Sequence, residues 1–163
     1  MHPDIKNAIE TYLGKATELG KIVELDEMAE LQTKLTTPLP HWYAQLLSTY
    51  PLAGLYLDHP LYEADDDDDG YVSLQIATPR DIYAETEECY PGLAIRDLGY
   101  ACFAIDPIGS GDPYFIKVED GDNPPVYRVY HDVGETGTDI EAQGMVKIAN
   151  SLTEFFHNAR PDN

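Results

Sequence analysis

From Gly99 to Asp132 the chain reads GYACFAIDPIGSGDPYFIKVEDGDNPPVYRVYHD, and this stretch decides its fold. Three runs rich in apolar and aromatic side chains, typical of β-strands, occupy Tyr100–Ile105, Tyr114–Val118 and Val126–His131. Two clusters of Gly, Asp, Asn and Pro, which favour turns, separate these runs. The stretch therefore predicts three neighbouring strands of a meander.

The remainder of the chain predicts helices and two further strands. Apolar residues recur at helical spacing after Pro3, which predicts an opening helix that stops at Gly20. Other helices are predicted from Asp26, acting as a cap, to Leu35, from His41 to Tyr50, from Thr78 to Glu88, and after Ser151, fraying at 160–161. The further strands are predicted at 71–77 and 145–149, and loops at 51–70 and 133–144.

The charge balance narrows the class of partner. The 163 residues carry 30 acidic and 10 basic side chains, a formal net charge of -20. Such a surface repels nucleic acid and anionic membranes, so we expect neither as a partner. A basic protein would be attracted, because complementary charge speeds association. The same charge can also serve solubility alone, and composition does not separate these two interpretations.

Cysteine usage and the N-terminus bear on the compartment. Cys89 and Cys102 are too few for a disulfide framework, so both are predicted to be buried free thiols. The chain opens with no basic segment followed by an apolar run, as a secretory signal would. The uncharged stretch 35–57 holds three prolines and polar side chains, which favours a core segment over a membrane span. These features predict a cytoplasmic protein.

Few residues suggest chemistry. Asp65, Asp67 and Asp69 before Gly70 match the opening of a calcium-binding loop, but Ile76 stands where that loop needs a bidentate glutamate. The segment 109–111 has no lysine for a phosphate and is predicted to be a turn. His131 and Asp132 form the one base–acid pair that could act in catalysis, and a structural histidine is the simpler interpretation. We expect no catalytic residue, no cofactor and no metal site.

The order of these motifs resembles the SUKH superfamily, the Smi/Knr group of cell-wall regulators and bacterial immunity proteins. The resemblance covers Leu25 to Phe156 and rests on joint order. Its motifs are the acidic helix before Leu39-Pro40, Trp42-Tyr43 with Leu46-Leu47, the helix after Thr78-Pro79, Gly99-Tyr100 to Ile105, Gly109 to Phe115, Pro125 to Asp132, and Ser151 to Phe156. The helix before Gly20 and the aspartate run lie outside the family pattern.

The resemblance implies an α+β fold, with a central, largely antiparallel sheet and helices packed against it. One domain suffices for this length, since domains span about 100 to 200 residues. We expect residues 1–24 to form an additional N-terminal helical extension and residues 25–158 to form the SUKH-like core. The resemblance also implies a site without catalytic residues.

The resemblance and the charge together favour a non-enzymatic protein-binding module. Family members of the immunity type neutralise a cognate toxin, often a nuclease, by binding it. The first hypothesis is therefore an immunity protein that binds a basic toxin domain. The alternatives are a regulatory or scaffold module of the same fold and, third, an enzyme that uses His131 and Asp132. The partner-binding residues predicted from their charge are Asp65, Asp66, Asp67, Asp68, Asp69, Glu85, Glu87 and Glu88. The sequence leaves the oligomeric state open.

Overall fold

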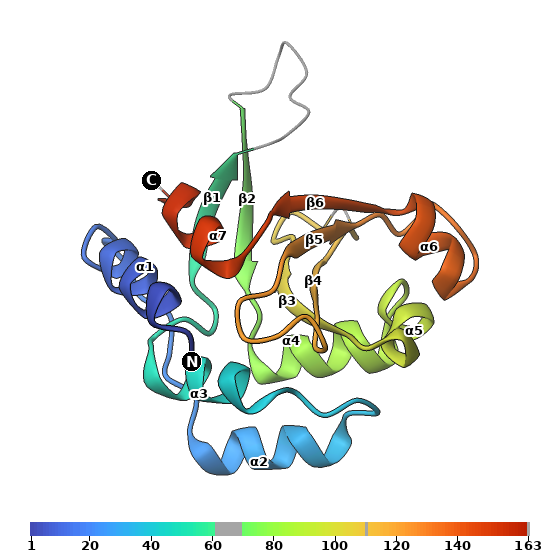
Figure 1. Cartoon of the computed structure of the whole chain (residues 1–163), viewed down its shortest axis with the longest axis horizontal. Coiled ribbons are helices and arrows are strands. Elements are labelled where there is room, and N and C mark those ends of the chain that lie inside the picture. The colour runs from blue at the N-terminus through green and yellow to red at the C-terminus, as the bar shows by residue number, and fades with distance from the viewer. Residues whose placement is uncertain (61–69, 110, 163) are drawn as a thin grey trace.

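The chain folds into one curled antiparallel sheet with helices packed against it (Figure 1). The structure is a computed structural model that describes residues 1–60, 70–109 and 111–162. Within these residues the sheet has seven strands in the order β6-β5-β4-β3-β2-β1-β7. The predicted α+β class and the additional N-terminal helix are confirmed.

The elements follow one another along the chain with short connections. The strands are β1 (Tyr56–Pro60), β2 (Tyr71–Ile76), β3 (Tyr100–Ile105), β4 (Tyr114–Lys117), β5 (Val126–Val129), β6 (Met145–Ala149) and β7 (Arg160–Pro161). The α-helices are α1 (Pro3–Leu13), α2 (Leu25–Lys34), α3 (His41–Thr49), α4 (Pro79–Tyr83), α5 (Gly92–Ile95), α6 (Gly137–Gln143) and α7 (Leu152–Asn158). A π-helical turn, η1 (Ala84–Glu88), continues α4, and a 3-10 turn, η2 (Arg96–Leu98), continues α5.

The meander predicted from residues 99–132 forms the middle of the sheet. Strands β3, β4 and β5 are antiparallel neighbours, and β3 occupies the central position. Its residues Tyr100 to Ala104 are all nearly inaccessible to water. Gly109 and Gly111 adopt positive φ angles of 82° and 81°, which the turn before β4 requires and which glycine adopts without strain.

Aromatic side chains fill the core where α3 and α7 meet the sheet. Phe103 of β3 packs edge-on against Phe155 and Phe156 of α7, with ring centroids 5.3 Å and 6.5 Å away. Tyr43 of α3 also packs against Phe103, and its hydroxyl donates a hydrogen bond of 2.9 Å to the carbonyl of Cys102. These contacts fix two helices from opposite ends of the chain to one strand.

The capping signals predicted at Thr78 and Ser151 are confirmed, the first in full and the second in part. Thr78 accepts a hydrogen bond from the backbone of Asp81, whose carboxylate accepts one from the backbone of Thr78, so the capping box starts α4 as expected. The helix predicted from His41 is confirmed as α3. At the last helix Ser151 accepts from the backbone of Glu154, which confirms half of the predicted box.

Two predicted helix boundaries are wrong, one of them for a nonlocal reason. The opening helix ends at Leu13 rather than at Gly20, and Gly20 instead packs against the backbone of Leu52 and Ala53, where a β-carbon would lie within 2.8 Å. The second helix begins at Leu25, one residue before the predicted cap at Asp26. The presence of glycine at position 20 is therefore explained by close contact with the backbone of a distant segment, and not by the end of a helix.

Three segments predicted to be irregular have regular structure. The loop predicted at 51–70 contains β1, which pairs with β2 and β7. The loop predicted at 133–144 contains α6, whose cap Thr136 accepts from the backbone of Asp139. The chain predicted to fray at 160–161 instead forms β7. Pairing with distant strands stabilises two of these elements, so local composition concealed them.

The two cysteines differ in their surroundings. Both are free thiols, as predicted, but Cys89 is exposed and only Cys102 is buried. Burial raises the pKa of the Cys102 thiol well above its ordinary value, so this group is protonated at neutral pH. None of the helices in the described part of the chain has the length and apolar character needed to span a bilayer.

His59 lies fully buried in β1 and should make stability depend on pH. Its ring stacks on Phe155 at a centroid distance of 4.8 Å, and Nδ1 lies 3.2 Å from the carbonyl of Pro60. Burial lowers the pKa of this imidazole, against smaller opposing effects of Pro60 and Glu154. The folded protein therefore binds a proton at His59 less readily than the unfolded chain does.

We expect stability to fall as pH drops below the unfolded histidine pKa of about 6.5, because protonation favours the unfolded chain. The variant His59→Leu should lose less unfolding free energy than the wild type between pH 7.5 and pH 5.5. Urea unfolding at a series of pH values measures this difference. The exposed His157→Asn serves as the control and should follow the wild type, whereas parallel curves for His59→Leu and wild type would contradict the assignment.

Candidate partner-binding surface

The predicted partner-binding set lies in two places along the chain. Asp65 to Asp69 fall outside the described residues, as do the first ligands of the calcium-loop alternative. Glu85, Glu87 and Glu88 lie in η1, which continues the helix that the Thr78 capping box starts. The structure therefore describes the surroundings of these three glutamates.

Glu87 is engaged within the fold. Its carboxylate accepts hydrogen bonds from the backbone and hydroxyl of Thr36, at 2.6 Å and 2.9 Å, and from Nη1 of Arg96 at 2.7 Å. The side chain is only 6% exposed. This carboxylate thus ties η1 to the segment after α2, and its charge is matched by the Arg96 guanidinium.

The two neighbouring glutamates differ in exposure. Glu85 is half-buried, and burial, followed by the nearby charge of Asp81, raises the pKa of its carboxyl. Glu88 is exposed. Of the three glutamates predicted in this cluster, Glu88 presents its carboxylate most freely to a partner.

An apolar groove lies between α2 and α3. Its volume is about 580 Å³. Met28 and Leu39, 3% and 4% exposed, form part of its lining, and Leu25 at its edge is 75% exposed. Gln32 shapes one end, because its amide both donates to and accepts from the backbone of Leu39, at 2.9 Å and 2.8 Å.

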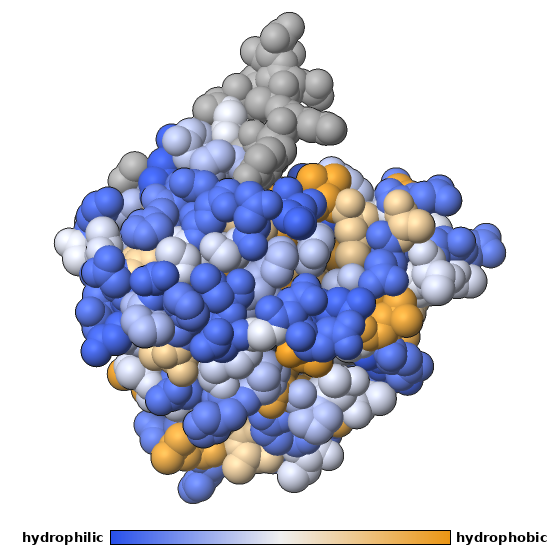
Figure 2. Space-filling view, viewed as in Figure 1, coloured by the Kyte–Doolittle hydropathy of each residue, from blue (hydrophilic) through white to orange (hydrophobic). Residues whose placement is uncertain are grey.

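Exposed carboxylates lie on and beside α2, although none of them lines the groove itself and Glu27 lines a separate hollow with Lys34 and Arg80. Glu24, Asp26, Glu27 and Glu30 are all exposed on or beside α2, and among them Glu30 is paired with Lys34 at 2.6 Å. Figure 2 shows hydrophilic residues over most of the visible face, with small apolar patches, one of them at the lower edge over α2. We call the groove and the residues Glu24, Asp26 and Glu27 the acidic groove. It combines the apolar lining of the groove with carboxylates carried by the same segment of the chain.

The sequence contained a signal for this groove. Met28, Leu31 and Leu35 mark the face of α2 that packs on the core, and Met28, Leu31 and Leu35 are buried as that spacing predicts. Leu25, Met28 and Ala29 form a second apolar stripe at positions i, i+3 and i+4, and the polar Gln32 follows on the same helix face at i+7. A helix with two apolar stripes has more apolar surface than one core contact uses.

His131, the candidate base, pairs with a residue other than the one predicted. Its Nδ1 lies 2.8 Å from Oδ1 of Asp112, and Arg128 reaches the other carboxylate oxygen at 3.2 Å. The hydrogen bond to Asp112 is the main reason why the pKa of His131 is raised. The ring also packs against Gly111, so this cluster fastens the turn before β4 to the end of β5.

The arrangement around His131 is that of a structural cluster. Asp112 is 8% exposed and is held by both a guanidinium and an imidazole. In residues 1–60, 70–109 and 111–162 no group of three His, Cys, Asp or Glu side chains could hold a metal ion.

Comparison with known proteins identifies the family. The profile of the SMI1 / KNR4 family (SUKH-1) matches residues 22–158, which is most of the chain. No curated protein matches the sequence, and no solved structure matches the fold. The match includes α2 to α7 and the sheet through β6, while α1 precedes it and β7 follows it. The chain belongs to the SMI1/KNR4 (SUKH-1) family.

Proposed function

We propose that this protein is a non-enzymatic immunity protein that neutralises a basic toxin domain by binding it directly. The observation that carries the proposal is the net charge of -20 on a member of a family of immunity and binding modules. A nuclease must present cationic groups to phosphates. An acidic protein can cover those groups and so block access of the nucleic acid.

The acidic groove supplies the best contact surface for such a partner. Charge complementarity selects a partner segment rich in Lys and Arg, and the groove floor selects apolar side chains beside them. The exposed Leu25 offers apolar area that no residue of the described chain covers fully. We therefore assign the groove to a basic segment with one apolar face, carried by the toxin domain.

Neutralisation of a toxin is tested by capture followed by growth. The full chain, immobilised at low ionic strength, is expected to retain a basic protein from its native host, because screening is weak there. Expression of that protein alone should stop growth of a laboratory strain, and co-expression of this chain should restore it. If the retained proteins do not impair growth, the regulatory or scaffold alternative replaces the immunity proposal.

The charge around the groove should control the rate of association. With the captured partner, the variant Glu24→Gln/Asp26→Asn/Glu27→Gln should associate about tenfold more slowly, since neutral surfaces lose electrostatic steering. Surface plasmon resonance across a series of NaCl concentrations measures this, and the difference should shrink as salt rises.

A matched control variant removes the same number of negative charges at another place on the surface. The variant Glu119→Gln/Asp120→Asn/Asp122→Asn changes three exposed carboxylates in the turn between β4 and β5. It should associate at close to the wild-type rate. Equal slowing in both variants would assign the effect to total charge and would exclude the acidic groove as the contact surface.

Leu25 should control the lifetime of the complex. Leu25→Ser removes an apolar side chain that is 75% exposed, so the fold should retain its stability. Dissociation should become about tenfold faster if a partner buries this side chain, because burial of a leucine contributes about 1.5–3 kcal/mol. The control Leu93→Ser changes another exposed leucine, on α5, and should leave the dissociation rate unchanged. Unchanged dissociation for Leu25→Ser would exclude the groove.

A further inference from the structure

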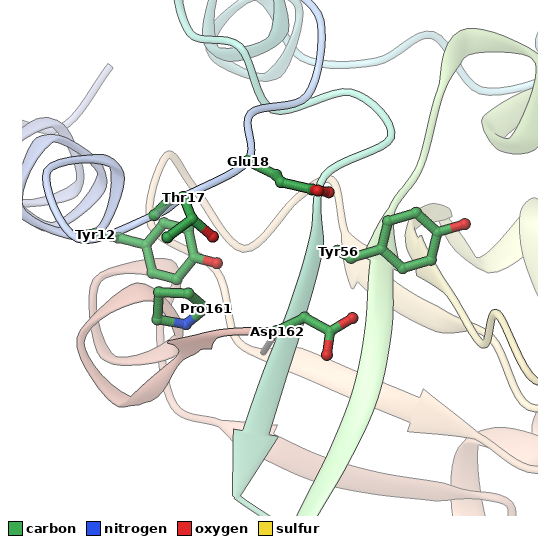
Figure 3. A pocket seen from close by; sticks show the side chains of 7 residues that line it. Tyr12, Thr17, Glu18, Tyr56, Pro161 and Asp162 are labelled. Carbon is green, nitrogen blue, oxygen red and sulfur yellow. The ribbon is translucent and has the colours of Figure 1, made fainter.

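A second, smaller cavity lies where both ends of the chain meet the edge of the sheet. Its volume is about 280 Å³, and it is lined by Tyr12, Thr17, Glu18, Tyr56, Pro161 and Asp162 together with Ala16 (Figure 3). Tyr12 comes from α1, Tyr56 from β1, and Pro161 from β7, which pairs with β1. We call it the terminal pocket.

The Tyr12 hydroxyl is a buried polar group that lacks a partner. The residue is 2% exposed, its ring packs against Phe156, and its oxygen makes no hydrogen bond to any residue that the structure describes. Burial, and then the charges of Asp58 and Asp162, raise the pKa of Tyr12 to about 12, so the hydroxyl is protonated at neutral pH. A buried hydroxyl without a partner is costly, and its oxygen can accept a hydrogen bond from a ligand.

The pocket is also negatively charged. Glu18 and Asp162 line it, no lysine, arginine or histidine does, and neither carboxylate has an ion-pair partner among the described residues. Arg160, the adjacent cation along the chain, pairs with Asp58 at 3.2 Å and stacks over the ring of Tyr71 at 3.4 Å. The two carboxylates therefore attract a cation that the described chain does not supply.

The shape of the pocket limits which cation fits. In Figure 3 the hydroxyls of Tyr12 and Thr17 and the carboxylates of Glu18 and Asp162 surround one space, and the rings of Pro161 and Tyr56 lie at its sides. These rings and Ala16 offer apolar contact to methylene groups. An ammonium group carries three donors that can point to acceptors on different sides, whereas a guanidinium presents a flat fork suited to one carboxylate.

We propose that the terminal pocket binds a primary alkylammonium group, with the Tyr12 hydroxyl and the carboxylates of Glu18 and Asp162 as its acceptors. The lysine side chain of a partner protein and a free polyamine carry the same group. The proposal stands apart from the acidic groove and from any toxin. The family match covers residues 22–158, so the three proposed acceptors all lie outside the matched residues.

A titration of the full isotope-labelled chain with n-butylammonium chloride tests the proposal by NMR. Saturable amide shifts are expected at Thr17, Glu18 and Asp162. The variant Glu18→Gln/Asp162→Asn should abolish saturation, because it removes both charges at exposed positions. Tyr12→Phe should weaken binding about tenfold, since it removes one hydrogen bond to a charged donor.

Matched controls separate a site from general attraction of cations. Asp120→Asn/Asp122→Asn removes two exposed charges between β4 and β5 and should bind as the wild type does. Butyltrimethylammonium has the same charge without N–H donors and should bind at least about tenfold more weakly. If Tyr12→Phe does not fold, loss of saturable binding in Glu18→Gln/Asp162→Asn is the result that tests the proposal. Absence of saturation in the wild type, or equal binding by both double variants, overturns the proposal.

The source of the ammonium group follows from two more probes. Nα-acetyl-lysine-N-methylamide should bind as n-butylammonium does if the pocket receives a lysine side chain of a partner. Spermidine should bind far more tightly than either if the pocket receives a free polyamine, because its additional charges reach both carboxylates. Binding of either probe supports the assigned chemistry, and failure of both overturns it whatever the outcome for the toxin.

Discussion

Three arginines neutralise carboxylates that folding removes from water. These ion pairs connect separate elements of the fold to one another. The pairs join separate elements that are 9, 16 and 102 residues apart in sequence, and each carboxylate side chain is no more than 11% exposed. The pairs are Arg96 with Glu87, Arg128 with Asp112, and Arg160 with Asp58. Removal of the arginine from such a pair leaves a nearly buried carboxylate without its counter-charge, which destabilises the fold. With few cations available, an acidic chain can bury a carboxylate only where a guanidinium meets it.

This use of arginine leaves the surface strongly negative. Guanidinium groups engaged in these ion pairs cannot compensate carboxylates elsewhere, so many exposed carboxylates of the described residues make no ion pair with an arginine. Repulsion among surface carboxylates opposes the compact state. A basic partner relieves that repulsion as well as adding contacts, so its charge contributes twice to the stability of the complex. The same scarcity of cations that shapes the fold therefore favours the proposed class of partner.

The sequence predicted elements whose ends are marked locally and missed those stabilised from a distance. The sequence predicted the capping box of Thr78 and Asp81, because both of its halves lie within four residues. Strand β1 was not predicted, because it buries Asp58 and His59, residues typical of loops and surfaces. It becomes a strand through pairing with β2 and β7, and the charge of Asp58 is held by Arg160, 102 residues later in the chain. No local pattern contains that information.

The same distinction applies to the candidate sites. A charge count treats Glu87 and Glu88 alike, yet folding turns one toward Arg96 and leaves the other in water. The acidic groove could be predicted in part from the sequence, because α2 carries a second apolar stripe that includes Leu25. The terminal pocket could not be predicted from the sequence. Its acceptors come from residues 12–18 and 162, and the positions of α1 and β7 in the fold bring them together. Counting charges thus predicts the kind of partner, while the pairing of strands and arginines decides which carboxylates remain to meet it.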